Sequence, residues 1–179
     1  MEPTFMYDST DPFAIPLRAA RVAGYVDGVK SQWTRAGWDR FGHGIVLVTI
    51  TVTGNPGADV ADCENGDLTD AEAAQWALVK NQAGKVGTIY RQLSAWEGCK
   101  AEVAKVGARV NWWVAEWTGH VHEIAGADVV QYASPTTGSG GDWDLSVVTN
   151  PNWFPLPAPW QDQALAHVKA AARIIEHHL

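Results

Sequence analysis

At 179 residues with 46% hydrophobic content, the chain is long enough for one domain with a substantial core and too short for two comfortable ones. Its formal net charge of -7 argues against a nucleic-acid-binding surface and offers no electrostatic attraction to polyanionic wall polymers. We expect no membrane span, no signal peptide and no disulfide framework, so synthesis in a cytoplasm with reduced thiols fits best.

Eight β-rich runs recur along the chain, and several are nearly continuous in β-branched and aromatic residues. Such runs are typical of strands that are buried on both faces of a parallel sheet. We expect strands at 4–9, 22–28, 45–53, 58–64, 86–90, 109–117, 128–134 and 143–148.

Helical signals are strongest after the fourth and fifth runs. After the fourth, Thr69 is predicted as the N-cap, and Glu72 three residues later completes a capping box. After the fifth, Ser94 and Glu97 stand in the same relation. Weaker helical stretches, at 11–20 and 30–41, follow the first two runs, so strands and helices alternate over most of the first two thirds.

The last three strands are linked by loops rich in Gly, Ser and Thr that leave no room for a crossover helix. This pattern predicts a TIM-like (β/α) barrel of eight strands over residues 1–154, with helices reduced or missing after the last three strands. A Pro-rich joint and an amphipathic C-terminal helix are expected at 155–179. The apolar face of that helix needs a surface, which either the barrel or a protein partner supplies.

Two carboxylates close the fourth run. Residues two apart in a strand point to the same side, so Asp62 and Glu64 project together. They lie at the C-terminal end of the strand, which is the rim where barrels of this class do their chemistry. Two carboxylates held close at an apolar strand end repel each other, so one tends to stay protonated, and glycosidic cleavage requires such an acid and base. The alternative is an ordinary strand-end Asp followed by a solvated turn.

Other acids fall at comparable strand ends. Asp8 closes the first run, Asp27 the second and Glu116 the sixth, while Asp144 opens the eighth. Acids that are separated in the sequence and converge on one rim are the pattern of a glycan-cleaving centre, although a structural ion-pair cluster would give the same pattern.

The ordered motifs "YDST", "ADCENGD", "GTIY", "WWVAEW", "VVQYAS" and "WDLS" resemble the glycoside hydrolase family 25 lysozymes over roughly residues 4 to 150. The resemblance implies a β/α barrel with helices missing near its end. It also implies cleavage of peptidoglycan between N-acetylmuramic acid and N-acetylglucosamine, with retention of anomeric configuration. Glu64 would be the general acid/base, and Asp62 would orient the acetamido group or stabilise the developing positive charge.

By the same resemblance, Asp8 and Asp144 shape and charge the site, and Gln131 and Tyr132 match the seventh-strand "QY". Trp113 and Glu116 fall in the sixth-strand motif, so Glu116 joins the candidate substrate-binding residues. Asp27 is also a candidate because of its strand-end position, although the family assigns it no standard role. The chain departs from the family pattern after Asp8, where "STDPF" supplies neither His nor Trp, and in its third strand.

Ten tryptophans offer flat faces for sugar rings, but most are expected in the core. Trp112 and Trp113 are adjacent in a strand, so at most one faces the barrel interior. Trp117 and Trp143 lie beside rim loops and are predicted to line a substrate groove.

No metal or cofactor is expected. His120 and His122, with Glu123, have a spacing that suits a metal, but two histidines in a loop are more often polar loop residues. Alternation turns Cys63 away from its two acidic neighbours, so a small buried side chain is a better interpretation than a nucleophile.

The leading hypothesis is a lysozyme-like glycosidase that cleaves cell-wall peptidoglycan, such as a phage endolysin or virion-associated protein that acts at the bacterial cell wall. The alternative is a non-catalytic glycan-binding or structural barrel domain of a phage tail protein, since a fold does not imply a function. An enzyme acting on another polysaccharide is a third option.

Overall fold

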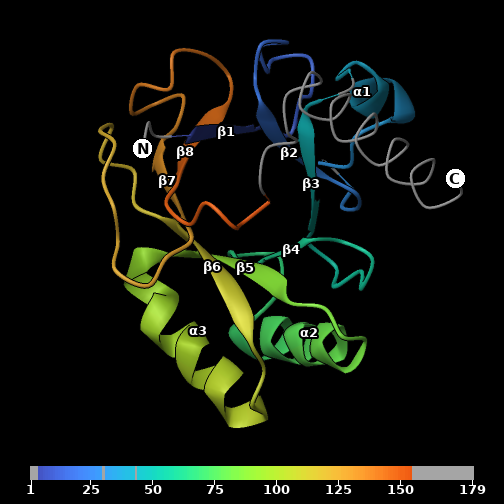
Figure 1. Ribbon diagram of the computed structural model, residues 1–179, viewed down its shortest axis with the longest axis vertical. Helices are drawn as coiled ribbons and strands as arrows, with labels where there is room; N and C mark the ends of the chain where they lie inside the picture. Colours follow the sequence, from blue (N-terminus) through green and yellow to red (C-terminus); the bar gives the residue numbers. More distant parts are fainter. Residues whose placement is uncertain (1–3, 30, 43, 155–179) are drawn as a thin grey trace, which may run out of the picture.

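The computed structural model describes residues 4–29, 31–42 and 44–154, and the strands in this part close into a single barrel (Figure 1). Its strands are β1 (Thr4–Asp8), β2 (Arg21–Tyr25), β3 (Val46–Thr51), β4 (Val60–Asp62), β5 (Gly87–Gln92), β6 (Val110–Ala115), β7 (Val129–Ala133) and β8 (Asp144–Val148). They follow one another around the barrel in chain order. The predicted fold class, a TIM-like barrel of eight strands, is confirmed.

One strand runs against the others. Strands β1 to β7 pair in parallel, whereas β8 pairs antiparallel with both β7 and β1. In the β1–β8 register Asp8 faces Asp144. The first residue of β8 therefore lies at the same rim as the last residue of β1. Asp144, at the start of its strand, is thus beside Asp8, at the end of its own.

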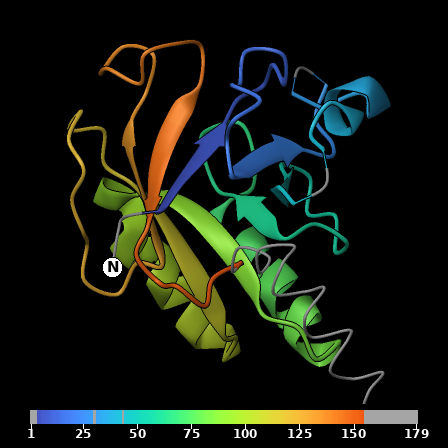
Figure 2. The same ribbon diagram turned by 45° about the horizontal axis from the view of Figure 1, so that its top comes forward.

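The helices are α1 (Arg35–Asp39), α2 (Asp70–Gln82) and α3 (Leu93–Val106). Helices α2 and α3 pack side by side against β4, β5 and β6, whereas loops surround β7, β8 and β1 (Figures 1 and 2). Within the described part of the chain no helix follows β6, β7 or β8, as predicted. Within residues 4–154, therefore, the long helices cover the barrel on one side only.

The predicted capping box of α2 is confirmed. The Thr69 hydroxyl accepts the Glu72 amide, and the Glu72 carboxylate accepts the Thr69 amide at 2.8 Å. A helix forms after β5, as predicted, but its predicted cap at Ser94 was wrong, because α3 begins at Leu93 and its N-cap Gln92 makes no side-chain hydrogen bond to the backbone. Strand β5 runs directly into α3, so the cap position falls on the last residue of the strand. Ser94 lies inside the first turn.

The two weaker helical predictions were largely wrong. Residues 11–20 form turns, in which the Ala14 amide bonds the Asp11 carbonyl at 3.2 Å and the Ala19 amide bonds the Pro16 carbonyl at 3.0 Å. Prolines in this stretch lack an N–H and disfavour helical backbone in the preceding residue, which prevents a continuous helix. In the second stretch only the five residues of α1 are helical, capped by Thr34.

The core follows the period-two alternation of the strands. Inward-facing side chains pack inside the barrel: Met6, Ala23, Val48, Ile50, Val60, Tyr90, Trp113, Ala115, Val129, Val148 and Trp153. The Trp153 indole N–H donates to the Thr88 hydroxyl at 2.9 Å within this core. Trp113 faces inward, whereas Trp112 packs outside with the α2–α3 cluster, so the alternation predicted for this pair is confirmed.

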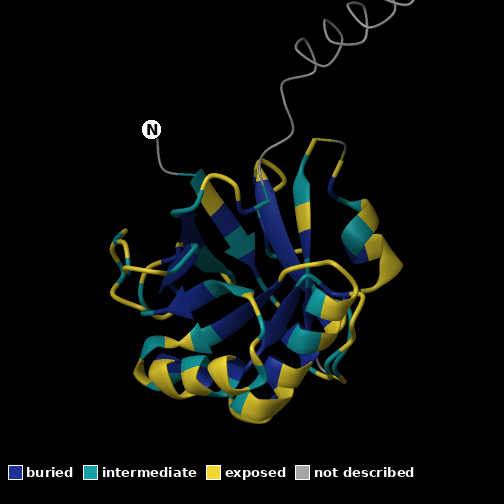
Figure 3. Cartoon of the chain, turned by 60° about the horizontal axis from the view of Figure 1, so that its bottom comes forward, coloured by how far each residue is buried: buried dark blue, intermediate teal, exposed yellow. Residues whose placement is uncertain are grey.

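The strands are mostly buried, and most exposed residues lie on the outer faces of the helices and on the loops (Figure 3). Among the described helices none is long and apolar enough to cross a membrane. The predicted Pro-rich joint, C-terminal helix and protein partner concern residues 155–179, which lie outside the described residues.

Candidate active site

A pocket of about 60 Å³ opens at the rim formed by the C-terminal ends of β1 to β7. This volume is well below the roughly 300–1,000 Å³ of typical ligand pockets, so the pocket by itself has room for only a small chemical group. The lining residues are Asp8, Tyr25, Ile50, Asp62, Glu64, Tyr90, Trp113, Trp117, Gln131 and Asp144. The pocket contains four carboxylic acids, and no basic side chain is among these described lining residues.

Backbone pairing explains why the acids meet. Asp62 is paired with Tyr90 across β4 and β5, in the same way that Asp8 is paired with Asp144. Strand β4 is shorter than predicted and ends at Asp62, so Glu64 lies beyond it. The Cys63 amide still donates to the Tyr90 carbonyl at 3.1 Å, which carries the alternation one residue further. Glu64 therefore lines the same pocket as Asp62.

Gln131 links the pocket's side chains. Its amide nitrogen donates to both carboxylate oxygens of Asp8, at 3.2 and 3.1 Å, and to Asp144 Oδ2 at 3.3 Å. Its oxygen accepts the Tyr90 hydroxyl at 2.7 Å and the Trp117 indole N–H at 2.8 Å. This buried amide fixes the relative positions of groups from β1, β5, β7, β8 and the loop after β6.

Asp62 is 2% exposed, and only one of its two carboxylate oxygens has a hydrogen-bond partner. Its Oδ2 accepts the Tyr25 hydroxyl at 3.2 Å, while its buried Oδ1 has no hydrogen-bond partner. Burial, and then the Glu64 carboxylate, raise the pKa of Asp62 well above its usual range. A buried acceptor without a partner is rare, and one that belongs to a pocket-lining residue is a group that a ligand N–H or O–H would satisfy.

The other three acids also bind protons more tightly than free carboxyls. Burial, and then Asp67, raise the pKa of Glu64, against opposing contributions from Tyr90 and Arg91. Burial, and then Asp144, raise the pKa of Asp8 well above its usual range. Burial, and then Glu64, raise the pKa of Asp144 to about 6. Raised pKa values bring carboxyl groups closer to the pH range in which they can both give and take protons, as acid/base chemistry needs.

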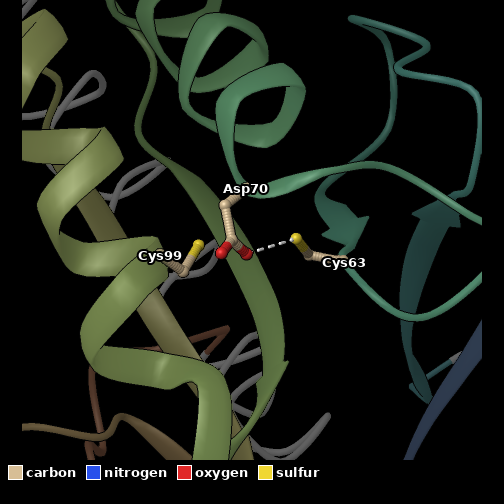
Figure 4. A group of neighbouring side chains, drawn as sticks. All are labelled: Cys63, Asp70 and Cys99. Atoms are coloured by element: carbon tan, nitrogen blue, oxygen red, sulfur yellow. Dashed lines mark hydrogen bonds between the residues drawn. The ribbon is translucent and has the colours of Figure 1, made fainter.

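Behind Glu64, a second network ties β4 to α2. Arg91 pairs with Asp70 Oδ1 at 3.0 Å and donates to the Cys63 carbonyl at 2.5 Å. The Cys63 thiol donates to Asp70 at 3.2 Å (Figure 4). These bonds hold the backbone on both sides of the turn that carries Glu64, so the turn is anchored at both ends.

Cys63, Asp70 and Cys99 form the group of potential metal ligands that the described residues bring together, with ligand atoms within 4.8 Å of one another (Figure 4). The group lies among the apolar side chains that α2 and α3 bury, outside the pocket. The neighbouring Cys99 thiol and burial both raise the pKa of Cys63, so its thiol stays neutral. Cys63 points away from Asp62 and Glu64, as predicted.

Two of the predicted substrate-binding acids lie outside the pocket. Asp27 accepts bonds from the Thr51 hydroxyl at 2.5 Å and the Val52 amide at 2.8 Å, which ties the ends of β2 and β3 together. Glu116 pairs with His122 at 2.7 Å within the loop after β6. Both carboxylates face the protein's own groups, because each lies beyond its strand end, where alternation no longer fixes a side chain's direction.

Two predicted contacts from β7 and β8 also differ from the pocket lining. Tyr132 follows the inward-facing Gln131 and so points outward, where it packs 6.3 Å from the Phe5 ring between centroids. Trp143 lines a neighbouring groove together with Thr10 and Asp142. The aromatic residues of the pocket itself are Tyr25, Tyr90, Trp113 and Trp117.

Sequence reasoning gave no site role to Tyr25, Ile50 or Tyr90. Each belongs to the inner face of its strand near the C-terminal end, and Tyr90 is the pairing partner of Asp62. The alternation that assigned Asp62 to the interior would have assigned these residues as well, once the strand ends were fixed.

Fold and pocket together define a closed, mixed eight-stranded barrel with an acidic pocket at its C-terminal rim. No protein-family model matches the chain, and no curated protein shows significant sequence similarity to it. The catalytic domain of endolysin Ply40, from bacteriophage P40 of Listeria monocytogenes, shares the fold with a TM-score of 0.57 and 16% identity, over 83% of this chain and 94% of that one.

Two further solved structures share the barrel. The Tat-secreted protein Rv2525c of Mycobacterium tuberculosis has a TM-score of 0.52 and 12% identity, over 84% of this chain and 98% of that one. The CTP1L endolysin has a TM-score of 0.50 and 10% identity, over 82% and 67% respectively. The chain therefore has the fold of endolysin catalytic domains.

Proposed function

We propose that this protein is a glycoside hydrolase of the family 25 lysozyme type, which cleaves peptidoglycan glycan strands between N-acetylmuramic acid and N-acetylglucosamine. The observation that carries the proposal is the convergence of Asp8, Asp62, Glu64 and Asp144 in one rim pocket. Its endolysin-like fold is consistent with this activity. We infer that the protein acts at the bacterial cell wall, as a phage lysin or a virion-associated enzyme.

Glu64 acts as the general acid. It is half-buried, and the surroundings that raise its pKa keep it protonated to a higher pH than a free glutamate. Its proton passes to the glycosidic oxygen as the bond from C1 to that oxygen breaks, and the downstream glycan leaves with a new hydroxyl group.

Asp62 assists at the same sugar. Its carboxylate accepts the acetamido N–H, and the acetamido carbonyl oxygen bonds to C1 from the face opposite the leaving group as the glycosidic bond breaks. That N–H and the positive charge developing at C1 both favour the ionised form of Asp62. Water then attacks C1 from the side of the departed glycan and displaces the acetamido oxygen, Glu64 takes a proton from that water, and the two inversions leave the configuration at C1 retained.

Asp8, Asp144 and Gln131 shape the floor of the pocket. The carboxyl groups supply negative potential near the developing charge, and the Gln131 amide holds them apart in a fixed geometry. Because these groups are oriented by protein bonds before substrate arrives, little reorganisation is needed during the reaction.

The test is to incubate the purified protein with isolated bacterial cell walls and analyse the soluble fragments by mass spectrometry. We expect fragments with N-acetylmuramic acid at the reducing end, and no release by Glu64→Gln. Glu97→Gln is the matched control, because Glu97 is an exposed glutamate on α3 that pairs with Lys100 and lies outside the pocket lining. This variant should release the same fragments as the unaltered protein.

The outcomes separate the proposed enzyme from the non-catalytic alternative. If walls bind the protein but release nothing, and Glu64→Gln binds equally well, the barrel is a glycan-binding or structural domain. If soluble fragments appear with other reducing ends, the bond assignment is wrong. Release that persists in Glu64→Gln would remove Glu64 from the mechanism.

A further inference from the structure

The two cysteines of the chain meet in the folded protein. Cys63 follows the end of β4, Cys99 lies within α3, and Asp70 is the first residue of α2. The two sulfur atoms and a carboxylate oxygen of Asp70 all lie within 4.8 Å of one another. Figure 4 shows the three side chains pointing toward one another from these separate elements. None of the three takes part in the proposed reaction.

We propose that Cys63, Asp70 and Cys99 bind one Zn²⁺ ion, with a water molecule as its fourth ligand. Thiolates and carboxylates are ligands that Zn²⁺ takes in proteins, and a site with three protein ligands leaves one position for water. Each thiol gives its proton to solvent as its sulfur binds the metal. One Zn²⁺ ion therefore enters, and two protons leave.

The spacing of the ligand atoms suits tetrahedral coordination. With Zn–S bonds of about 2.3 Å and a Zn–O bond of about 2.1 Å, the ligand atoms of such a site stand about 3.6–3.8 Å apart. The Cys63 sulfur is 3.2 Å from Asp70 Oδ1, and no distance within the cluster exceeds 4.8 Å. Shifts of about 1 Å or less therefore bring the three ligand atoms to tetrahedral spacing.

Arg91 balances the charge of the metal site. A Zn²⁺ ion with two thiolates and one carboxylate carries a single net negative charge, which is costly beside apolar groups unless a cation offsets it. Arg91 Nε lies 3.0 Å from Asp70 Oδ1. Its guanidinium therefore neutralises the loaded site and holds the ligating carboxylate in place, as partners of metal ligands commonly do.

The site is dry on the protein side and reachable on the solvent side. Both cysteines are buried among apolar side chains of β4, β5, α2 and α3. The Asp70 side chain is 26% exposed and lines a surface groove together with Arg91. A cation can therefore enter along the carboxylate, and the groove supplies the water for the fourth position.

Metal binding ties the end of β4 to the starts of two packed elements, α2 and the helix beside it. The unfolded chain does not hold its two cysteines and Asp70 together, so binding the metal stabilises the folded state. Zn²⁺ at about 100 times its Kd should raise the Tm of a chain of this size by ~5–10 °C.

Titration of the reduced protein with Co²⁺ tests the site. Thiolate ligands give Co²⁺ a strong charge-transfer absorption in the near ultraviolet, which histidine or carboxylate ligands do not give. We expect this absorption to saturate at one Co²⁺ per chain and to disappear when Zn²⁺ displaces the cobalt. The matching rise in Tm with Zn²⁺ is measured on the same sample.

Three variants each remove one ligand. Loss of a group that merely supports a ligand costs about 10–100-fold in metal affinity, so Cys63→Ala and Cys99→Ala should each weaken Co²⁺ binding by more than ~100-fold. Asp70→Asn should weaken it about tenfold or more, because an amide is a poorer ligand than a carboxylate. Glu97→Gln, an exposed change on the same helix as Cys99, is the control and should bind Co²⁺ as the unaltered protein does.

The outcomes separate this site from two buried thiols that only pack. Absence of charge-transfer absorption, or equal Co²⁺ binding by both cysteine variants, overturns the site. Unweakened binding by Asp70→Asn overturns the role of the carboxylate. Cadmium NMR of the unaltered protein counts the sulfur ligands without any variant, and a signal from fewer than two sulfurs also overturns the site. No wall glycan is present, so these results are independent of the proposed glycosidase activity.

Discussion

Asp144→Asn should stabilise the folded protein at neutral pH. Asp144 faces Asp8 across the β1–β8 pairing, and its pKa is raised to about 6 by burial and then by Glu64. Asparagine keeps an oxygen that accepts the Gln131 amide, which donates to Asp144 at 3.3 Å. The substitution therefore removes a charge and keeps the hydrogen bond.

The magnitude follows from the pKa difference between the folded and unfolded chain. A carboxyl whose pKa is raised on folding stabilises the fold when protonated, and that stability is lost as the pH rises from the unfolded value near 4 through about 6. Each pKa unit corresponds to about 1.36 kcal/mol, so wild type should lose ~2–3 kcal/mol between about pH 4 and pH 7.5 on account of Asp144. Asp144→Asn avoids this loss.

Urea unfolding at the two pH values measures the effect. We expect the free energy of unfolding of Asp144→Asn to exceed that of wild type by ~2 kcal/mol more at about pH 7.5 than at about pH 4. Asp142→Asn, an exposed change two residues away, is the control and should show no such difference. A difference between Asp144→Asn and wild type that is the same at both pH values would refute the reasoning.

Two further predictions concern the same pocket. Asp67→Asn removes the charge that, after burial, most raises the pKa of Glu64. The basic limb of the pH profile of kcat/KM for wall glycan should therefore move to lower pH. A basic limb that stays in place would contradict this role of Asp67. Gln131→Leu removes the hydrogen-bond partner of the buried Tyr90 hydroxyl and of the Asp8 carboxyl. The free energy of unfolding measured in urea titrations should therefore fall by ~2–5 kcal/mol. A loss below ~1 kcal/mol would show that these hydrogen bonds contribute little to stability.

Much of the fold could be predicted because it is encoded locally. The strands are apolar runs, and the start of α2 is marked by the side chains of Thr69 and Glu72, which bond each other's backbone. The start of α3 was misplaced because its position depends on β5 running directly into it, which no local motif marks. The same applies to the direction of β8, since antiparallel pairing is a property of the assembled sheet.

In the candidate site, too, some residues could be assigned from local sequence patterns and others depend on neighbouring strands. Asp62 and Glu64 could be assigned together because a period of two is a local property of extended chain. Asp27 has the same sequence signature, a carboxylate near a strand end, yet its oxygens accept protein hydroxyl and amide donors. Asp27 and Asp62 differ in the donors that surround them. The hydroxyls of Thr51 and Thr53 donate to Asp27, whereas a buried oxygen of Asp62 has no hydrogen-bond partner.

The antiparallel β8 accounts for both the helix-free connection between β7 and β8 and the composition of the pocket. A parallel β8 would need a crossover of about a dozen residues or more, usually a helix, whereas an antiparallel one can follow β7 through a loop. A parallel β8 would also put the first residue of the strand at the opposite rim. At ~3.3 Å per residue, that reversal would move Asp144 by roughly the length of the strand, far out of reach of Asp8. The missing helix between β7 and β8 and the fourth acid of the pocket therefore have one structural cause.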